Sequence, residues 1–261
     1  VYKRQVMARV DYKNMIHFRE ELFDKHKLFA GMELVPLETY ENVETKSIWE
    51  FKTPMMEGFY QPFLVKGDDK IEKLLIGELH YMKRAIYGSL AITVSDDYDL
   101  PLFTCEFDQT APRATVAIDF MPAVDMSVHQ EYREKYYTPL AGLWRKYRTI
   151  EGLTKDGRCL LQRRYGHAPW ARETLSCYLL DGKIEEEEPR HQVIEAVVAY
   201  AQVWLDHWRK AEPVEDPAYK QKILKRRKTI KDYYLAHSPG GEMLKKLFGA
   251  EKSHLIESLL F

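Results

Sequence analysis

Two stretches decide the fold: residues 98–106, YDLPLFTCE, and residues 114–122, ATVAIDFMP. In the second stretch apolar side chains recur at every other position, which is typical of a strand because successive side chains point to opposite faces of a sheet. The same alternation predicts a strand over residues 102–108, with phenylalanine and cysteine on one face and polar side chains on the other. Residues 109–113 between them predict a hairpin, so the two strands are expected to pair.

Each predicted strand carries a carboxylate, Glu106 in the first and Asp119 in the second. Two carboxylates on paired strands can lie close enough to raise the pKa of one of them, and such a carboxyl is a usable proton donor near neutral pH. The alternative is that both are ordinary strand residues on a solvated face. The pattern by itself leaves both interpretations open.

The two strands belong to a strand-rich region over residues 33–122, and a helix is predicted before it over residues 14–29. Three more helices are predicted after it, over residues 191–210, 219–237 and 242–248. Gly249 is a typical C-terminal stop for the last of these helices. Helix, then strands, then helices predict an α+β fold in which helices cover a mostly antiparallel sheet. No repeat or low-complexity linker divides the chain, so we expect a single domain over residues 6–261. Residues 1–5 resemble a translated sequencing adapter and are treated as non-native.

Composition narrows the class of function. The net charge of −1 gives no indication of nucleic acid or of an anionic membrane as a partner. No apolar run reaches the ~18–20 residues that span a bilayer, and no signal peptide is recognised. Cys105, Cys159 and Cys177 are odd in number and widely spaced. This argues against a disulfide framework, a thiolate zinc site and an iron–sulfur cluster, and favours a reducing, cytosol-like compartment.

The aromatic content of 17 Tyr, 11 Phe and 5 Trp suits either a flat conjugated ligand or a well-packed core. The chain contains no GxGxxG, GxxxxGKS/T or GxSxG motif. A glycine-rich loop for the phosphates of a flavin or nicotinamide is therefore not evident. If the protein is an oxidoreductase, we expect its electrons to come from another protein.

Several segments resemble the ferredoxin-dependent bilin reductases. That family has a Y-x-L-P-I/L-F-x-x-D pattern, then an apolar strand with an aspartate near a proline, and residues 98–106 and 114–122 are similar to both. Pro169-Trp170, with Ser176-Cys177-Tyr178 beyond it, resembles a further family motif. Residues 193–205 resemble its long helix, and residues 243–261 its C-terminal helix, Phe-Gly, helix and Leu-Phe signature. The similarity spans roughly residues 60–261, with the pieces in the family's order.

The resemblance implies a three-layer α/β/α sandwich that holds an open-chain tetrapyrrole, a bilin, between the sheet and the C-terminal helices. It implies no metal and no bound organic cofactor. Single electrons would come from a reduced 2Fe-2S ferredoxin, and the protein would supply protons to the bilin. The expected partners are ferredoxin and the bilin, and the chain is expected to be a monomer. The expected location is the cytoplasm, for a bacterial or phage-encoded protein, or the plastid stroma if a transit peptide has been lost.

The resemblance also implies roles for individual residues. Glu106 occupies the position of the family's principal proton donor, an aspartate, and Asp119 matches a second family aspartate. Glu78 matches a glutamate of the phycocyanobilin enzymes if a one-residue gap is allowed. Ser89 stands where those enzymes have a histidine, and Ser238 where several members have an aspartate; both serines are expected to contact the substrate. Related enzymes that act on red chlorophyll catabolite carry glutamate at the position of Glu106.

His237 has two interpretations. It is either a substitute proton donor, since imidazole titrates near neutral pH, or a helix-end histidine that interacts with the last carbonyls. The basic segment over residues 220–231 also has two interpretations. It is either a solvated lysine-rich face or a binding surface, in which Arg226, Arg227 or Lys228 pairs with the bilin propionates. The outward lysines of this segment and of the last helix would dock an acidic ferredoxin: Lys225, Lys245 and Lys246.

The leading hypothesis is ferredoxin-dependent reduction of biliverdin IXα or a related bilin by proton-coupled single-electron steps. Glu106 would be the main proton donor, supported by Asp119, Glu78 and His237. One alternative, motivated by the glutamate at position 106, is reduction of a chlorophyll-derived linear tetrapyrrole. The other, motivated by the missing histidine and aspartate, is a bilin-binding protein without activity.

Overall fold

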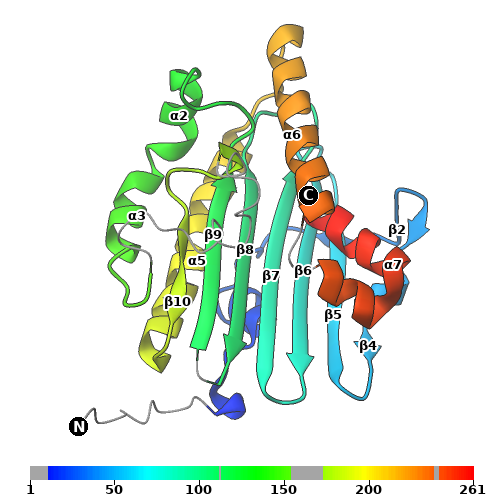
Figure 1. Cartoon of the computed structure of the whole chain (residues 1–261). Coiled ribbons are helices and arrows are strands. Elements are labelled where there is room, and N and C mark those ends of the chain that lie inside the picture. Colours follow the sequence, from blue (N-terminus) through cyan, green and yellow to red (C-terminus); the bar gives the residue numbers. More distant parts are fainter. Residues whose placement is uncertain (1–10, 112, 154–172, 238–240) are drawn as a thin grey trace.

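The computed structural model describes residues 11–111, 113–153, 173–237 and 241–261, and its centre is a large antiparallel sheet (Figure 1). Across the sheet the strands are β1 (Leu34–Pro36), β5 (Met56–Val65), β6 (Ile71–Tyr81), β7 (Ala85–Val94), β8 (Leu102–Thr110), β9 (Arg113–Met121) and β10 (Leu180–Ile184), and β4 (Phe51–Lys52) also pairs with β5. A separate hairpin consists of β2 (Thr39–Tyr40) and β3 (Val43–Glu44). The two strands predicted first, β8 and β9, are paired as expected.

The sheet has two different faces. We call the face that carries Ser89 and Glu106 the front face, and the face that carries Gly88 and Phe107 the back face. On β8 the back-face side chains are buried and most of the front-face side chains are only half-buried. This is the alternation that the sequence predicts for residues 102–108.

The back face is covered by α5 (Glu187–Lys210) and by the N-terminal segment. Trp204 of α5 is fully buried, and its indole Nε1 donates a hydrogen bond to the carbonyl of Pro101 at 2.8 Å. Phe18 of the N-terminal segment lies directly on Gly88, where an added Cβ would be 2.5 Å from its side chain. The back face is therefore the main hydrophobic core.

The front face is partly covered by α6 (Pro217–His237), α7 (Gly241–Leu260) and the short α1 (Lys46–Trp49). Apolar side chains of α7 form one buried cluster with those of β5, β6 and β7. On the other side of the molecule, α2 (Gln130–Tyr137) and α3 (Leu140–Tyr147) flank the sheet, with α3 against α5 (Figure 1). Helices, sheet and helices thus form three layers, which confirms the α+β class and the sandwich.

The predicted helix over residues 14–29 is wrong in its extent. The segment contains η1 (Tyr12–Asn14), a 3-10 turn, and a short helical stretch from residue 18 that becomes π-helical in η2 (Glu20–Lys25). The reason is a contact with the sheet: the Gln109 side chain accepts a hydrogen bond from the amide of Ile16 and donates one to its carbonyl. These backbone groups are then not available to a continuous helix.

The C-terminal helices agree better with the sequence. The helix α5 begins before His191, because Glu187 and Glu188 form its first turn, where the helix dipole favours carboxylates. The helix α7 breaks at Gly249, whose φ of 78° is in the left-handed region, and continues after it. None of the helices described is both long and apolar enough to cross a lipid bilayer.

Candidate functional site

Glu106 stands in the middle of the front face. The strand register pairs it with Ser89 on β7 and Ala117 on β9. Glu106 is half-buried. The neighbouring front-face residues of β8 and β9 are half-buried too: Thr104, Asp108, Thr115 and Ala117. In Figure 1, β8 and β9 are visible between α6 and the α2–α3 pair. The front face is therefore partly open at the middle of β8 and β9, whereas Ser89 and Ala91 on the same face of β7 are buried.

Asp119 lies on the same face, opposite Thr104. It is buried, and both the amide and the hydroxyl of Ser176 donate hydrogen bonds to its carboxyl group, the amide at 2.9 Å. Burial raises the pKa of Asp119 to about 6, although the hydrogen bonds from Ser176 oppose this, and the charge of Asp181 adds to it. The predicted raised carboxyl is present, but burial is its main cause.

Tyr234 of α6 lies close to both carboxylates. Burial raises its pKa, a hydrogen bond with Thr174 opposes this, and the charges of Asp119 and Glu106 raise it further. Its ring stacks on that of Phe261, with 4.2 Å between centroids and an angle of 18°. The end of α6 and the last residue therefore form one aromatic boundary of the site.

Tyr60 fills the front face beside Glu106. A Cβ added at Gly77, which pairs with Ser89, would lie 2.5 Å from the Tyr60 ring and 2.8 Å from the Ser89 hydroxyl. Burial raises the pKa of Tyr60, and the charges of Glu106 and Glu257 raise it further. The Ser89 hydroxyl is buried and has no hydrogen-bond partner among the described residues. This leaves a polar atom beside Glu106 that is free to bind a ligand.

Glu78 does not join this site. It pairs with Gly88, so its side chain points to the back face, away from Glu106. There its carboxyl lies against His17 and His80 and accepts a hydrogen bond from the amide of Arg19. The one-residue gap in the resemblance explains the error, because a shift of one position in a strand moves a side chain to the other face. A role for Glu78 as a proton donor beside Glu106 is therefore wrong.

The three candidate propionate partners differ in their surroundings. Arg227 is engaged elsewhere: its guanidinium donates to four backbone carbonyls, those of Val94, Ser95, Tyr98 and Leu100. Arg226 donates to the carbonyls of Pro122 and Glu173 and is partly exposed. Lys228 points to solvent and pairs with Asp232 at 2.7 Å. Arg227 is thus a structural residue, and Arg226 is the best placed of the three to meet a ligand.

The remaining predicted residues lie at the surface or outside the described ranges. His237 is the exposed last residue of α6, with its ring 4.9 Å from that of Tyr233. Lys225, Lys245 and Lys246 are exposed on α6 and α7, and Lys245 pairs with Glu242. Ser238 and the Pro169-Trp170 motif lie outside the described residues.

Comparison with known proteins identifies the family. A family model described as ferredoxin-dependent bilin reductase matches residues 86–261 of the 261. The chain belongs to this family. The match includes β8, β9 and the C-terminal helices, so it covers Glu106, Asp119 and the aromatic boundary of the site.

The sequence identity to individual bilin reductases is low. The 15,16-dihydrobiliverdin:ferredoxin oxidoreductase of Nostoc punctiforme is 24% identical over 92% of this chain and 90% of its own length. The chloroplastic phytochromobilin:ferredoxin oxidoreductase of Arabidopsis thaliana is 22% identical over 63% of this chain and 48% of its own. A crystal structure of tomato phytochromobilin synthase in complex with biliverdin superposes with a TM-score of 0.73, at 18% identity, over 95% of this chain and 83% of that one. The names of the Nostoc and Arabidopsis proteins agree on an oxidoreductase that uses ferredoxin.

Several residues of this bilin reductase site were not singled out from the sequence. Tyr60, Tyr234 and Glu257 reach the surroundings of Glu106 from β5, α6 and α7, and no local pattern marks any of them. Ser176 was noted only as part of a family motif, and its contact with Asp119 joins residues 57 positions apart. Such contacts depend on the tertiary fold.

Proposed function

We propose that this bilin reductase binds biliverdin IXα, or a bilin derived from it, against the open front face over β8 and β9. The observation that carries the proposal is the half-buried carboxyl of Glu106 at the centre of that open surface. The names of the relatives support the substrate class, since one acts on 15,16-dihydrobiliverdin and the tomato protein was crystallised with biliverdin. A flat conjugated ligand also suits the aromatic rings at the edge of the site.

The chemistry requires proton donors. Reduction of one carbon–carbon double bond consumes two electrons and two protons, and ferredoxin supplies only electrons, one at a time. In the proposal Glu106 gives the first proton to the bilin. Asp119, whose pKa of about 6 keeps part of the population protonated near neutral pH, is the second source. Glu257 is buried beside Tyr60 on the α7 side, which places a third carboxyl near the site.

Two further contacts complete the proposal. The buried Ser89 hydroxyl is proposed to hydrogen bond to a polar atom of the bilin, because it lies beside Glu106 and lacks another partner among the described residues. Arg226 is proposed to pair with a propionate at the edge of the site, since a guanidinium binds carboxylates with two parallel hydrogen bonds.

The test compares Glu106→Gln with the unaltered chain in anaerobic mixtures of bilin, ferredoxin and a ferredoxin-reducing system. Glutamine keeps the size of the side chain but carries no transferable proton. We therefore expect bilin binding to be retained and turnover to fall ~10²–10⁴-fold, the usual contribution of a general acid. Absorption spectra follow both quantities. Asp108→Asn, two positions along the same strand and face, is the matched control and should remain active. A fully active Glu106→Gln enzyme would remove Glu106 from the mechanism.

Glu106 itself favours a second candidate substrate. Because the family pattern has aspartate at this position, the longer side chain moves the carboxyl by about one methylene and changes which carbon it reaches. Biliverdin, 15,16-dihydrobiliverdin and a chlorophyll-derived linear tetrapyrrole should be offered side by side. Exclusive turnover of the last would replace the first proposal, and tight binding without turnover of any would indicate a bilin-binding protein.

A further inference from the structure

A cluster of two histidines and one glutamate lies on the back face, on the opposite side of the sheet from Glu106. Glu78 and His80 are two positions apart on β6 and so point the same way, and His17 reaches them from the N-terminal segment. The Oε1 atom of Glu78 is 2.7 Å from Nε2 of His80 and 3.3 Å from Nδ1 of His17. The three potential ligand atoms all lie within 4.8 Å of one another.

The surroundings orient these atoms toward a common point. The other oxygen of Glu78, Oε2, accepts a hydrogen bond from the amide of Arg19 at 3.0 Å, which leaves Oε1 facing the histidines. The Nδ1 atom of His80 is 2.6 Å from the hydroxyl of Tyr12, which leaves its Nε2 facing Glu78. In metal sites, a histidine ligand usually has its second ring nitrogen hydrogen bonded to an oxygen, which fixes the orientation of the ring. The contact between His80 and Tyr12 has this form.

We propose that His17, Glu78 and His80 bind one divalent transition-metal ion of the zinc class. Two imidazole nitrogens and one carboxylate oxygen are a donor set that suits zinc, with water in the fourth position. In a tetrahedral zinc site the ligand atoms are roughly 3.3 Å apart. The distances from Glu78 Oε1 to the two histidine nitrogens, 2.7 and 3.3 Å, are near this value, and the histidine nitrogens lie within 4.8 Å of each other. The widely spaced cysteines argue only against thiolate ligands and leave a histidine site open.

Binding requires a free lone pair on Nε2 of His80. A proton on Nε2 of the neutral ring must first move to Nδ1 by way of solvent, with no net release, whereas an imidazolium ring releases its Nε2 proton to solvent. The bound ring then carries one proton, on Nδ1, and donates it to the oxygen of Tyr12. The charge of Glu78, which is buried, is offset by the cation.

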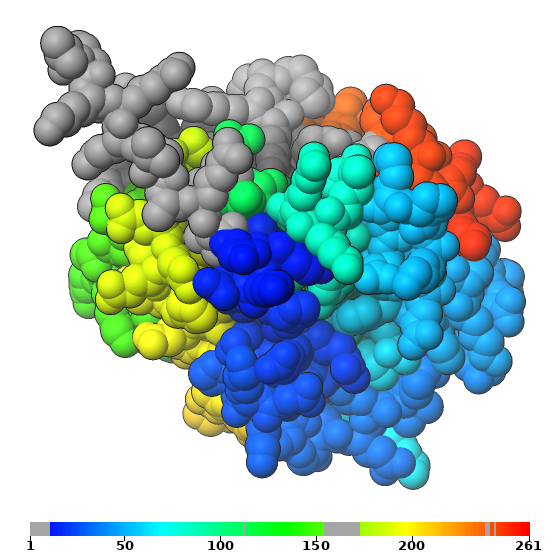
Figure 2. Space-filling model, turned by 90° about the horizontal axis from the view of Figure 1, so that it is seen from below, coloured from blue at the N-terminus to red at the C-terminus, as the bar shows by residue number. Residues whose placement is uncertain are grey.

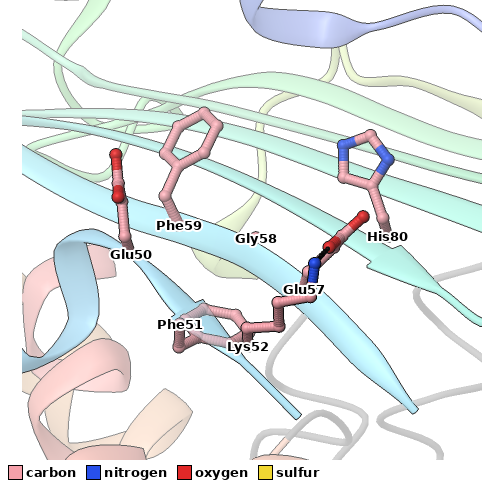
Figure 3. Close-up of a pocket in the computed structure, with 7 residues that line it drawn as sticks. All are labelled: Glu50, Phe51, Lys52, Glu57, Gly58, Phe59 and His80. Carbon is pink, nitrogen blue, oxygen red and sulfur yellow. Dashed lines mark ion pairs between the residues drawn. The ribbon is translucent and has the colours of Figure 1, made fainter. Parts of the chain in front are cut away.

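The ion can reach this place from solvent. The side chain of His17 is 43% exposed. Next to the cluster, His80 lines an open pocket of about 510 Å³ together with residues of β4 and β5, and Figure 3 shows its ring near Glu57. Figure 2 shows the N-terminal segment lying against the turn between β6 and β7. A bound ion would thus tie this segment to the sheet.

The test uses zinc chloride alone, titrated calorimetrically into the full chain without a histidine tag. We expect saturable binding of one ion per chain and a higher melting temperature with zinc. Cobalt(II) in place of zinc should give the visible absorption of a low-symmetry site. His17→Ala should abolish these signals and still fold, because the side chain is 43% exposed and lies outside the hydrophobic core. Tyr12→Phe should weaken binding ~10–100-fold, as loss of a partner that orients a ligand does.

The matched control is His129→Ala. His129 also faces a glutamate, with 3.4 Å between its Nδ1 and Glu131, but it belongs to no three-ligand cluster in the described chain. Its loss should leave zinc binding unchanged. Absence of saturable binding, or binding equal in His17→Ala and the unaltered chain, would overturn the proposal. Glu106→Gln should bind zinc normally, so the outcome is separate from that for bilin reduction.

Discussion

At the scale of single residues, the surroundings decide which carboxyl group has a raised pKa. Asp119 and Glu106 lie on the same face of neighbouring strands, but only Asp119 is enclosed. Its pKa of about 6 comes from burial first, and the charge that adds to it is that of Asp181. Mutual repulsion between Glu106 and Asp119, one of the two interpretations that the sequence left open, is not the main cause.

Asp119→Asn should change how stability depends on pH. Because the pKa of Asp119 is higher in the folded protein than in the unfolded chain, the folded state binds the proton more tightly. Its ionisation therefore lowers stability as the pH rises from about 4 to about 6. The asparagine variant lacks this loss, so the free energies of unfolding of the two proteins should shift relative to each other by about 3 kcal/mol over this interval.

Urea unfolding of both proteins at a series of pH values measures this difference. Asp206→Asn, on the exposed side of α5, serves as the control and should follow the unaltered protein. A constant difference between Asp119→Asn and the unaltered chain across the interval would show that the pKa of Asp119 is not raised.

The sequence predicted part of the site, and the reason lies in strand geometry. Glu106, Ser89 and Asp119 share a face because the side-chain period of a strand is two and the hairpin fixes the register. Glu78 was misplaced because a single-position offset reverses the face. Tyr60 and Glu257 were missed because their proximity to Glu106 depends on how β5 and α7 pack.

At the scale of elements, one side chain of α6 makes four hydrogen bonds to the segment that joins β7 to β8. Arg227 extends inward from the helix, is about nine-tenths buried, and bonds to four carbonyls between the end of β7 and the start of β8. Lys228, the next residue, points outward. The basic segment that the sequence presented as one surface therefore has an inner, structural side and an outer, solvated side.

Arg227→Lys should destabilise the fold by on the order of 2–4 kcal/mol, because one ammonium group cannot reach carbonyls that the guanidinium spans. Lys228→Ala should change stability by less than ~0.5 kcal/mol, since exposed ion pairs contribute little. Chemical denaturation of the two variants provides the measurement. Equal effects would contradict the assignment of Arg227 to the structural side.

The helices and strands were predictable to different degrees. The strands β8 and β9 follow from local alternation, and α6 was predicted over residues 219–237, two residues shorter than it is. The N-terminal segment could not be predicted, because its apolar spacing is helical while Gln109, 93 positions away from Ile16, takes its backbone hydrogen bonds.

At the scale of the whole molecule, the net charge of −1 conceals an uneven distribution. Exposed lysines lie on α6 and α7, the two helices beside the open front face: Lys222, Lys225, Lys228, Lys245 and Lys246. Ferredoxin is the electron donor of the family. We propose that this surface steers an acidic ferredoxin toward the bilin, since opposite charges accelerate encounter at low salt.

The double variant Lys225→Glu with Lys246→Glu should lower kcat/KM for ferredoxin and weaken its dependence on salt, with bilin binding unchanged. Steady-state rates at increasing sodium chloride give both quantities. Lys210→Glu, at the end of α5 on the back of the sheet, is the matched control and should behave as the unaltered chain. Identical salt profiles for all three proteins would place the docking surface elsewhere.

The ring of Tyr60 has a consequence for how this site can diversify. It occupies the volume above Gly77, so a longer side chain at position 77 is incompatible with the tyrosine. Substitutions at the two positions therefore depend on each other. A carboxylate at position 77 of β6 requires that Tyr60 is first, or at the same time, replaced by a smaller residue. While Tyr60 is present, acids on this part of the front face have to come from other strands and helices.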